Sequence, residues 1–84
     1  MTNADAQDIN KLPQYRSHKI VRAAKIVAID FDERLDLAPY GVVEVGKQWM
    51  VEKRAHVGGY FVVYEDDYTS YSPAAAFESG YSQV

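Results

Sequence analysis

The side chains that could do chemistry in this chain fall into a basic set and an acidic set, which occupy different segments. Between residues 9 and 29 every charged side chain is basic, namely Lys11, Arg16, Lys19, Arg22 and Lys25. From residue 65 onward every charged side chain is acidic, namely Glu65, Asp66, Asp67 and Glu78. Clustered basic side chains are typical of a site for phosphate or another anion. A seam between subunits, a solvated strand edge, or a basic strand that pairs with an acidic hairpin would have the same composition, and all of these interpretations stay open.

Tyrosine is the second unusual feature, since the chain has seven and five of them lie between Tyr60 and Tyr81. On an extended strand, alternate side chains project to opposite faces, so Tyr60 and Tyr64 would share one face and Phe61 would take the other. The rings could pair across strands and thicken a small core. They could equally form an exposed contact surface for a partner, or stack on nucleic-acid bases. The candidate binding residues are therefore Tyr60, Tyr64, Tyr68, Tyr71, Arg16, His18, Lys19, Arg22 and Lys25.

Nothing in the spacing of nucleophiles, bases or ligands indicates catalysis. The chain has no cysteine and no Gly-x-Ser-x-Gly turn, so the common nucleophilic arrangements are missing. His18 and His56 lie in separate segments without the acidic neighbours of a triad or a helical zinc site. The carboxylates of residues 30–36 lack calcium-loop spacing, and there is no phosphate-binding or dinucleotide fingerprint. We expect no enzyme activity, no metal site and no cofactor.

Composition narrows the class of protein and of partner. A chain of 84 residues with 48% hydrophobic side chains suits one small domain. The formal charge of −3 makes duplex DNA a poor partner, because affinity for it comes from neutralising many phosphates. The polar start lacks a signal-peptide pattern, and the longest apolar run is far shorter than a membrane span. Together with the absence of cysteine, this predicts a soluble cytoplasmic protein that does not enter the membrane.

The elements that must position these side chains can be read along the chain. Residues 1–14 show no sustained period and are expected to form a flexible N-terminal tail before a single domain at 15–84. Residues 19–31 are rich in β-branched side chains and predict a strand with a bulge at Ala23–Ala24, with a helix as the alternative. Charged residues and Pro39 predict a loop at 30–40. A strand at 41–45 and a short helix at 47–54 follow, with a continued strand as the alternative to that helix.

The last third of the chain carries the clearest local signals. Two β-type runs, 60–64 and 68–71, flank Glu65-Asp66-Asp67 and predict a hairpin. Ser72 as N-cap, Pro73 in the first turn and Gly80 as a left-handed C-terminal residue predict a helix at 73–79. We therefore expect a small α+β fold: an antiparallel sheet of about four strands, a mid-chain helix, and a C-terminal helix packed on one face. The other face of such a sheet could be covered in a homo-oligomer.

Several short tracts resemble one family. They are YRSHK at 15–19, the pattern VxAxKI at 21–26, GGYFVVYED at 58–66, Tyr68, SYSP at 70–73 and FESGY at 77–81. Together they resemble a family of small uncharacterised proteins encoded by tailed phages and prophages. The resemblance covers about half the chain, and Asp67 departs from it where the family usually has the hairpin glycine. It implies a phage (viral) origin and a shared fold, and it assigns no activity and no functional residue.

These observations leave three expectations for function. The first is a non-enzymatic phage accessory protein in the cytoplasm of the infected bacterial host, which binds a host or phage macromolecule, in the first place a protein, through the tyrosine-rich hairpin. An inhibitor of host defence would be one version. The second is an oligomeric binder that sequesters a nucleotide signal, with the basic side chains on phosphate and tyrosines on the base. The third is a minor structural protein of the virion.

Overall fold

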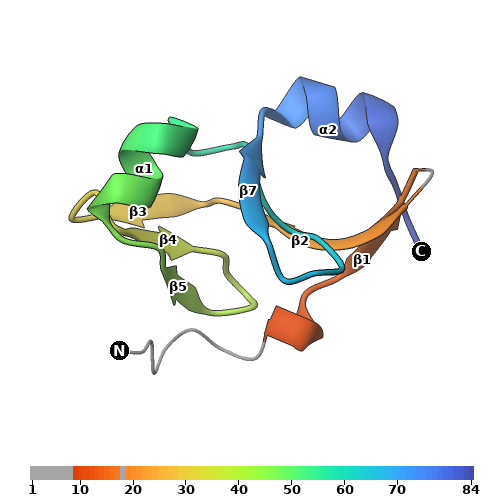
Figure 1. The fold of residues 1–84 in the computed structure, drawn as a ribbon, viewed down its shortest axis with the longest axis horizontal. Helices are drawn as coiled ribbons and strands as arrows, with labels where there is room; N and C mark the ends of the chain where they lie inside the picture. The colour runs from red at the N-terminus through yellow and green to blue at the C-terminus, as the bar shows by residue number, and fades with distance from the viewer. Residues whose placement is uncertain (1–8, 18) are drawn as a thin grey trace.

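The computed structural model describes residues 9–17 and 19–84 (Figure 1). Most of the expected tail and the candidate residue His18 lie outside these described residues. Short strands, two α-helices and one 3₁₀ turn (Ile9–Lys11) make up the described part of the chain.

The strands form two antiparallel sheets. The larger sheet has the order β7-β6-β2-β1-β8, where the strands are β1 (Gln14–Arg16), β2 (Ile20–Lys25), β6 (Tyr60–Val63), β7 (Thr69–Ser72) and β8 (Ser82–Gln83). The smaller sheet has the order β3-β4-β5, where the strands are β3 (Ala28–Asp30), β4 (Arg34–Asp36) and β5 (Val42–Glu44). Helix α1 (Lys47–Lys53) lies over the smaller sheet and helix α2 (Ala74–Gly80) lies over the larger one (Figure 1).

One extended segment passes from the larger sheet into the smaller. The amide of Ile26 donates to the carbonyl of Gly59 at 2.8 Å, which continues the pairing of β2 with β6. The next amide, that of Val27, donates to the carbonyl of Asp36 at 2.8 Å and so starts the smaller sheet. The β-branched run predicted at 19–31 therefore forms strands, but it forms two of them, β2 in the larger sheet and β3 in the smaller. Phe31 lies in the turn that follows β3, with a left-handed backbone (φ 57°). The expected bulge at Ala23–Ala24 is absent, since the register Ala23↔Val62 and Ala24↔Phe61 is uninterrupted.

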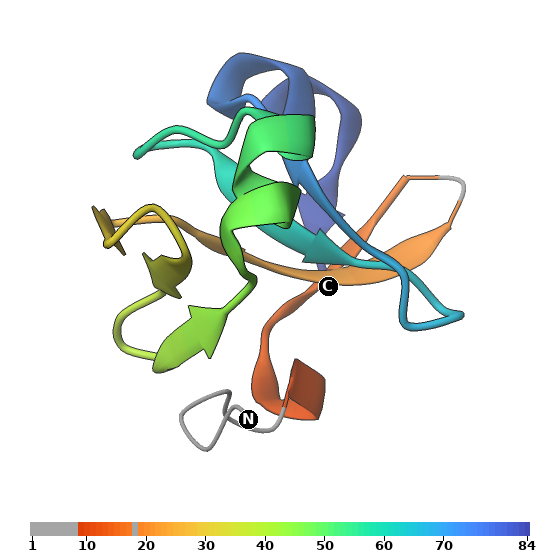
Figure 2. The same ribbon diagram turned by 60° about the vertical axis from the view of Figure 1, so that its left-hand side comes forward.

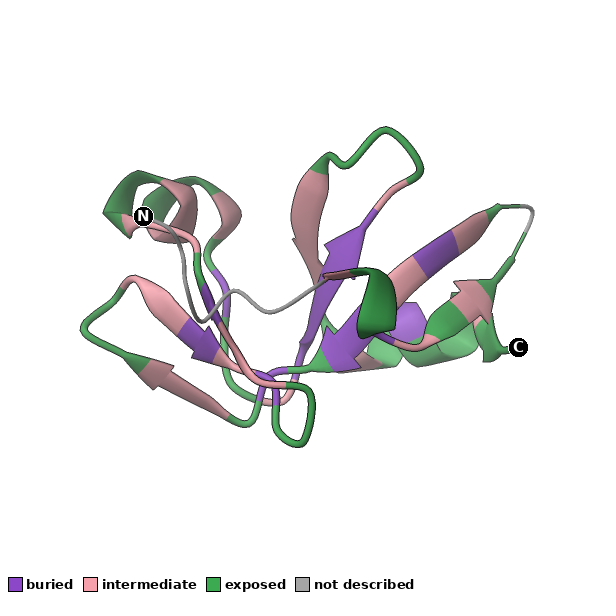
Figure 3. Ribbon diagram, turned by 90° about the horizontal axis from the view of Figure 1, so that it is seen from below, coloured by how far each residue is buried: buried purple, intermediate pink, exposed green. Residues whose placement is uncertain are grey.

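Two hydrophobic clusters lie on the two faces of the central strands. The first lies between the sheets and under α1, and its buried members are Leu12, Ala24, Ile26, Leu35, Leu37, Val43, Ala55, Phe61 and Val63. The second lies between the larger sheet and α2, and its buried members are Val21, Ala23, Tyr60, Val62 and Phe77. Strand β6 contributes to both and is buried along its whole length (Figure 3). Burial on both faces explains why 60–63 is an unbroken apolar run.

The α+β class, the mid-chain helix and the C-terminal helix on one sheet face are confirmed. The expected single sheet of about four strands is wrong, because the structure has a sheet of five and a sheet of three. Strand β4 lies inside the segment expected to be a loop. Its inward side chain, Leu35, is fully buried, while the charged neighbours Arg34 and Asp36 alternate with it. Because β4 has only three residues and two of them are charged, the alternation of buried and partly exposed side chains cannot be recognised in the sequence.

The expected start of the folded domain at residue 15 is also too late. Leu12 is only 3% exposed and belongs to the first cluster. Its carbonyl accepts a hydrogen bond of 3.1 Å from Arg22 Nη1, and the carbonyl of Pro13 accepts one of 2.9 Å from the amide of Ala23. The hydrogen bonds that the Leu12 and Pro13 carbonyls accept come from β2, about ten residues further along the chain, so local sequence patterns cannot indicate them.

Helix α2 differs from the prediction at both ends. Pro73 is the N-cap, with no side-chain cap, and the Ser72 hydroxyl donates at 3.4 Å to the carbonyl of Pro73. Gly80 is the last helical residue, and Tyr81 ends the helix in an extended conformation (φ −129°, ψ 147°). The ring of Tyr81 stacks on Phe77, with centroids 4.7 Å apart. This packing and the following strand β8 direct the chain at the helix end, so no left-handed glycine is needed.

Candidate functional site

The strongest candidate site lies at the turn between β6 and β7. The amide of Tyr64 donates to the carbonyl of Tyr68 at 2.8 Å, and the amide of Asp67 donates to the carbonyl of Tyr64 at 2.9 Å. Asp66 Oδ1 accepts a bond of 3.1 Å from the amide of Tyr68. Asp67 adopts a left-handed backbone (φ 68°), the position that glycine fills in three-residue hairpin loops and that aspartate tolerates better than most residues. The predicted hairpin is confirmed.

Two tyrosines stand together at this turn. The rings of Tyr64 and Tyr68 are 6.0 Å apart between centroids and are tilted by 31°. Tyr64 is half-buried, whereas Tyr68 is 55% exposed. Lys53, at the end of α1, donates a hydrogen bond to the Tyr68 hydroxyl, and its Nζ lies 4.5 Å from the ring centroid. The helix thus holds an exposed aromatic side chain in place.

A cleft of about 480 Å³ opens beside these rings and is lined by Lys19, Ile20, Tyr64, Glu65, Asp66 and Tyr68. A smaller cleft of about 250 Å³ shares Ile20, Tyr64 and Glu65 with it and adds Arg22 and Asp67 among its lining residues. The two clefts therefore flank the end of β6. Their linings combine two basic side chains with three carboxylates, a mixed charge that matches a polar protein surface better than it matches phosphate.

The other two candidate tyrosines of the hairpin have structural contacts. Tyr60 is only 8% exposed, its hydroxyl donates to Glu78 Oε2 at 2.8 Å, and its ring stacks on Phe77 at 4.2 Å. Tyr71 is half-buried and packs against the first hydrophobic cluster. Its ring covers Gly59, where a Cβ atom would lie 2.3 Å from the ring carbon Cε1. Of the four tyrosines, Tyr64 and Tyr68 are the two that line the cleft.

The basic candidates do not converge on one site within the described residues. The Arg22 side chain lies on the face of β2 that carries the first hydrophobic cluster, and it donates a hydrogen bond to the Leu12 carbonyl. Lys25 lies on the opposite face, where Nζ is 3.4 Å from Glu78 Oε2 and 5.6 Å from the centroid of Tyr60. Arg16 is exposed on β1, and Lys19 lines the larger cleft. The opposite directions of Lys25 and Arg22 agree with the strand prediction, and the pair Lys25–Glu78 joins the basic strand to the acidic C-terminal segment.

The surroundings of Tyr60 and Tyr64 raise the pKa of both hydroxyls and so keep them protonated. Burial raises the pKa of Tyr60 to about 12, and the hydrogen bond to Glu78 acts in the same direction. Burial also raises the pKa of Tyr64, and the nearby Tyr81 and Tyr68 add to this. The hydrogen bond from Tyr60 holds the pKa of the Glu78 carboxyl below its usual value, with help from Lys25. None of these shifts would activate a tyrosine as a nucleophile or base near neutral pH.

Among residues 9–17 and 19–84, no three His, Cys, Asp or Glu side chains are grouped so that they could hold a metal ion. Within those same residues, no helix is both long and apolar enough to cross a membrane.

Lys53 and the turn carboxylates Glu65 and Asp66 are neighbours of the tyrosine pair that were not among the candidate residues. Lys53 precedes Tyr68 by fifteen residues, and only the packing of α1 beside β7 brings them together. A second bond, from Trp49 Nε1 to Thr69 Oγ1 at 3.0 Å, fixes this packing. Glu65 and Asp66 are predicted as turn residues and as members of the acidic set. Their adjacency to Tyr64 and Tyr68 follows directly from the hairpin, and that signal was available in the sequence.

The chain matches no protein-family model, no curated protein and no solved structure.

Proposed function

We propose that this chain is a non-enzymatic accessory protein of a tailed phage that binds a protein partner in the cytoplasm of the infected bacterial host. The contact surface is the hairpin surface, defined as Lys19, Tyr64, Glu65, Asp66 and Tyr68. The observation that carries the proposal is the Tyr64–Tyr68 pair, of which one ring is held in place by Lys53 and remains more than half exposed.

A tyrosine pair held in this way suits protein recognition. Tyrosine is enriched in protein interfaces because it offers a large apolar ring and a hydroxyl on a side chain with few rotatable bonds. Contacts from α1 and the hairpin already restrict Tyr68, so binding would order it at little further cost. The cleft of about 480 Å³ beside the rings could receive one side chain of the partner.

The charges of the hairpin surface indicate what that side chain would be. Glu65 and Asp66 are exposed and line the cleft together with both rings. An arginine or lysine of the partner could pair with a carboxylate and lie over a tyrosine ring at the same time. The proposal therefore favours a partner segment that presents a basic side chain.

The phage setting is supported by the C-terminal tracts that resemble small phage proteins, which include both cleft tyrosines. Inhibition of a host-defence protein is one form that such binding could take. A nucleotide ligand is the alternative and a minor structural role in the virion is the third function. The nucleotide alternative has weaker support, because Arg22 and Lys25 point to opposite faces and carboxylates line the cleft.

Affinity capture from infected-cell lysate tests the proposal, with Tyr68→Ala as the variant. Tyr40→Ala is the matched control, because Tyr40 is also an exposed tyrosine and lies in the turn between β4 and β5. We expect a partner that both the wild type and Tyr40→Ala retain and that Tyr68→Ala loses. Capture of the same proteins by all three would contradict the proposal.

A thermal-shift screen with cyclic and linear nucleotides separates the nucleotide alternative. We expect no change in melting temperature, since ligand binding to the folded state alone would raise it. A rise of several degrees that Tyr68→Ala abolishes would replace the protein partner by a nucleotide.

A further inference from the structure

A second feature stands apart from the hairpin surface, at the turn between β3 and β4. Phe31 and Asp32 are the central residues of this turn, and the amide of Glu33 donates to the carbonyl of Asp30 at 3.1 Å. Both central residues have left-handed backbones (φ 57° and 55°). Turns of this shape favour asparagine and glycine, and a phenylalanine in them is unusual. The Phe31 side chain is 74% exposed.

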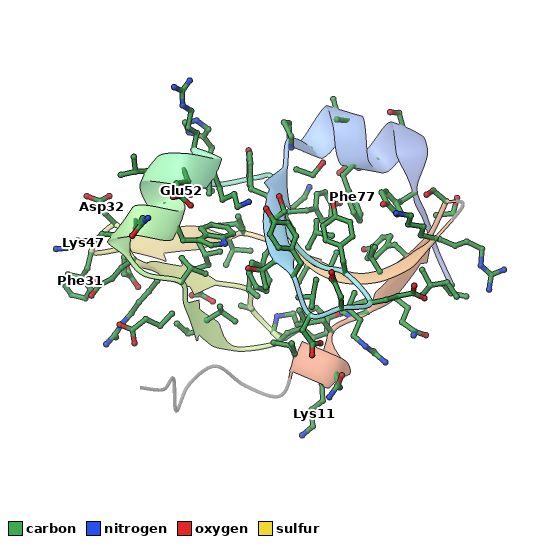
Figure 4. The ribbon with its side chains drawn as sticks, in the orientation of Figure 1. Lys11, Phe31, Asp32, Lys47, Glu52 and Phe77 are labelled. Carbon is green, nitrogen blue, oxygen red and sulfur yellow. The ribbon has the colours of Figure 1, made fainter. Side chains whose placement is uncertain are left out.

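An open cavity, lined by two charged and two apolar residues, lies at the same end of the molecule. It has a volume of about 330 Å³ and is lined by Asp32, Lys47, Met50 and Val51. Val51, on the outer face of α1, is 74% exposed. Figure 4 shows Phe31, Asp32 and Lys47 together at this end of the structure. A projecting ring and a hollow that could receive a ring are thus neighbours on one surface.

The size of the cavity fits one phenyl ring. The volume of about 330 Å³ leaves room for the side chain of a phenylalanine, which would lie against Met50 and Val51 on one side of an open depression. The Arg34 guanidinium lies 5.8 Å from the centroid of the Phe31 ring and leaves most of that ring open to solvent.

The charges on the rim complement each other across two copies. Asp32 and Lys47 both line the cavity, and neither side chain has an ion-pair partner within residues 9–17 and 19–84. In a two-fold dimer, a contact of one residue with another is repeated with the roles exchanged. Asp32 of one copy would then face Lys47 of the other, and the reverse pair would form as well.

From these observations we infer that a second copy of this chain docks here, each Phe31 ring entering the other copy's cavity between Met50 and Val51. A specific interface buries at least about 1,000 Å² in total, or about 500 Å² per copy. This is close to a tenth of the 5190 Å² surface of the chain. The dimer would leave the β6–β7 turn free, because that turn lies on the opposite side of the molecule from the β3–β4 turn (Figure 2).

Sedimentation equilibrium of the full chain over a concentration series tests the inference. We expect a wild-type dimer and a dissociation constant at least tenfold weaker for Phe31→Asn. Asparagine suits the left-handed turn, so this variant should fold at least as well as the wild type and loss of the dimer cannot be attributed to unfolding. Val57→Asn is the control, since Val57 is also exposed and does not line the cavity. A wild type that remains monomeric up to about 1 mM, or a Phe31→Asn variant that dimerises as well as the wild type, would overturn the inference.

A charge exchange tests the pairing itself. Asp32→Lys alone would place two lysines together, and Lys47→Asp alone would place two aspartates together, so each variant should dimerise more weakly than the wild type. An equimolar mixture of the two restores both opposite-charge pairs and should form a heterodimer. If the mixture behaves as the sum of its separate components, the proposed register is wrong.

Discussion

At the scale of single residues, the same side chain type has two roles in this protein. Tyr60 and Tyr71 are held by the core, one through Phe77 and Glu78 and the other against Gly59. Tyr68 projects from the hairpin and is held by Lys53. The position of each tyrosine along its strand predicts which face of the sheet its ring lies on. Their roles depend on which face is covered by α2 or α1, and this is decided by contacts between distant segments.

The alkaline limit of stability tests the role assigned to Tyr60. Its folded-state pKa of about 12 lies above the ordinary tyrosine pKa of about 10, so the folded state holds the hydroxyl proton more tightly. The stabilisation from this group is complete below pH 10 and is lost as the pH rises through about 12. We expect the melting temperature of the wild type to fall more steeply between pH 10 and 12 than that of Tyr60→Phe. Parallel curves would show that Tyr60 is not buried with its hydrogen bond to Glu78.

The close contact between Gly59 and the Tyr71 ring predicts a strong effect of one methyl group. Gly59→Ala should lower the free energy of unfolding by roughly 1–3 kcal/mol, because the ring must move away from the new Cβ. Gly80→Ala is the control, since nothing lies within 4 Å of a Cβ atom there and the residue is helical. Urea denaturation measures both.

The same contact can be checked in a second background. With Tyr71→Ala in place the obstructing ring is gone, so Gly59→Ala should cost much less there than in the wild type. An equal cost in the two backgrounds would contradict the proposed packing.

At the scale of elements, the helices and strands that could be predicted are those whose sequence signals lie within one hairpin or one helix. The runs at 60–64 and 68–71, the helix at 47–54 and the helix near 73–79 were all expected, because each has its own turn residues or helix formers. Strand β4 and the core position of Leu12 were not expected, since Leu35 and Leu12 become buried only when other strands cover them. For the site, residue types and the hairpin indicated Tyr64, Tyr68 and Lys19, whereas the link from α1 through Lys53 could not be predicted from spacing.

Helix α2 provides a test of how an element is held. It has seven residues, too few to be stable alone, and Phe77 is its one buried side chain. This ring contacts Tyr15, Tyr60 and Tyr81 with centroid distances of 4.2 to 4.8 Å. Phe77→Ala should lower the free energy of unfolding by about 3–5 kcal/mol. Phe31→Ala, measured at high dilution, is the control, because Phe31 is an exposed phenylalanine, and it should change the free energy of unfolding little. An equal loss of stability in the two variants would show that Phe77 does not anchor the helix.

At the scale of the whole molecule, two thin cores share the central strands β2 and β6 and present a different surface at each end. The hairpin surface combines fixed tyrosines with carboxylates and a lysine, and the β3–β4 turn combines an exposed phenylalanine with an open cavity. Both have the exposed apolar area beside polar groups that is typical of interaction sites.

Calorimetric titration of the captured partner measures the proposed binding of a protein by the hairpin surface. We predict that Tyr68→Ala raises the dissociation constant at least tenfold, equivalent to about 1.4 kcal/mol, while Tyr40→Ala leaves it within about twofold of the wild type. Equal dissociation constants for Tyr68→Ala and Tyr40→Ala would contradict the assignment of this surface.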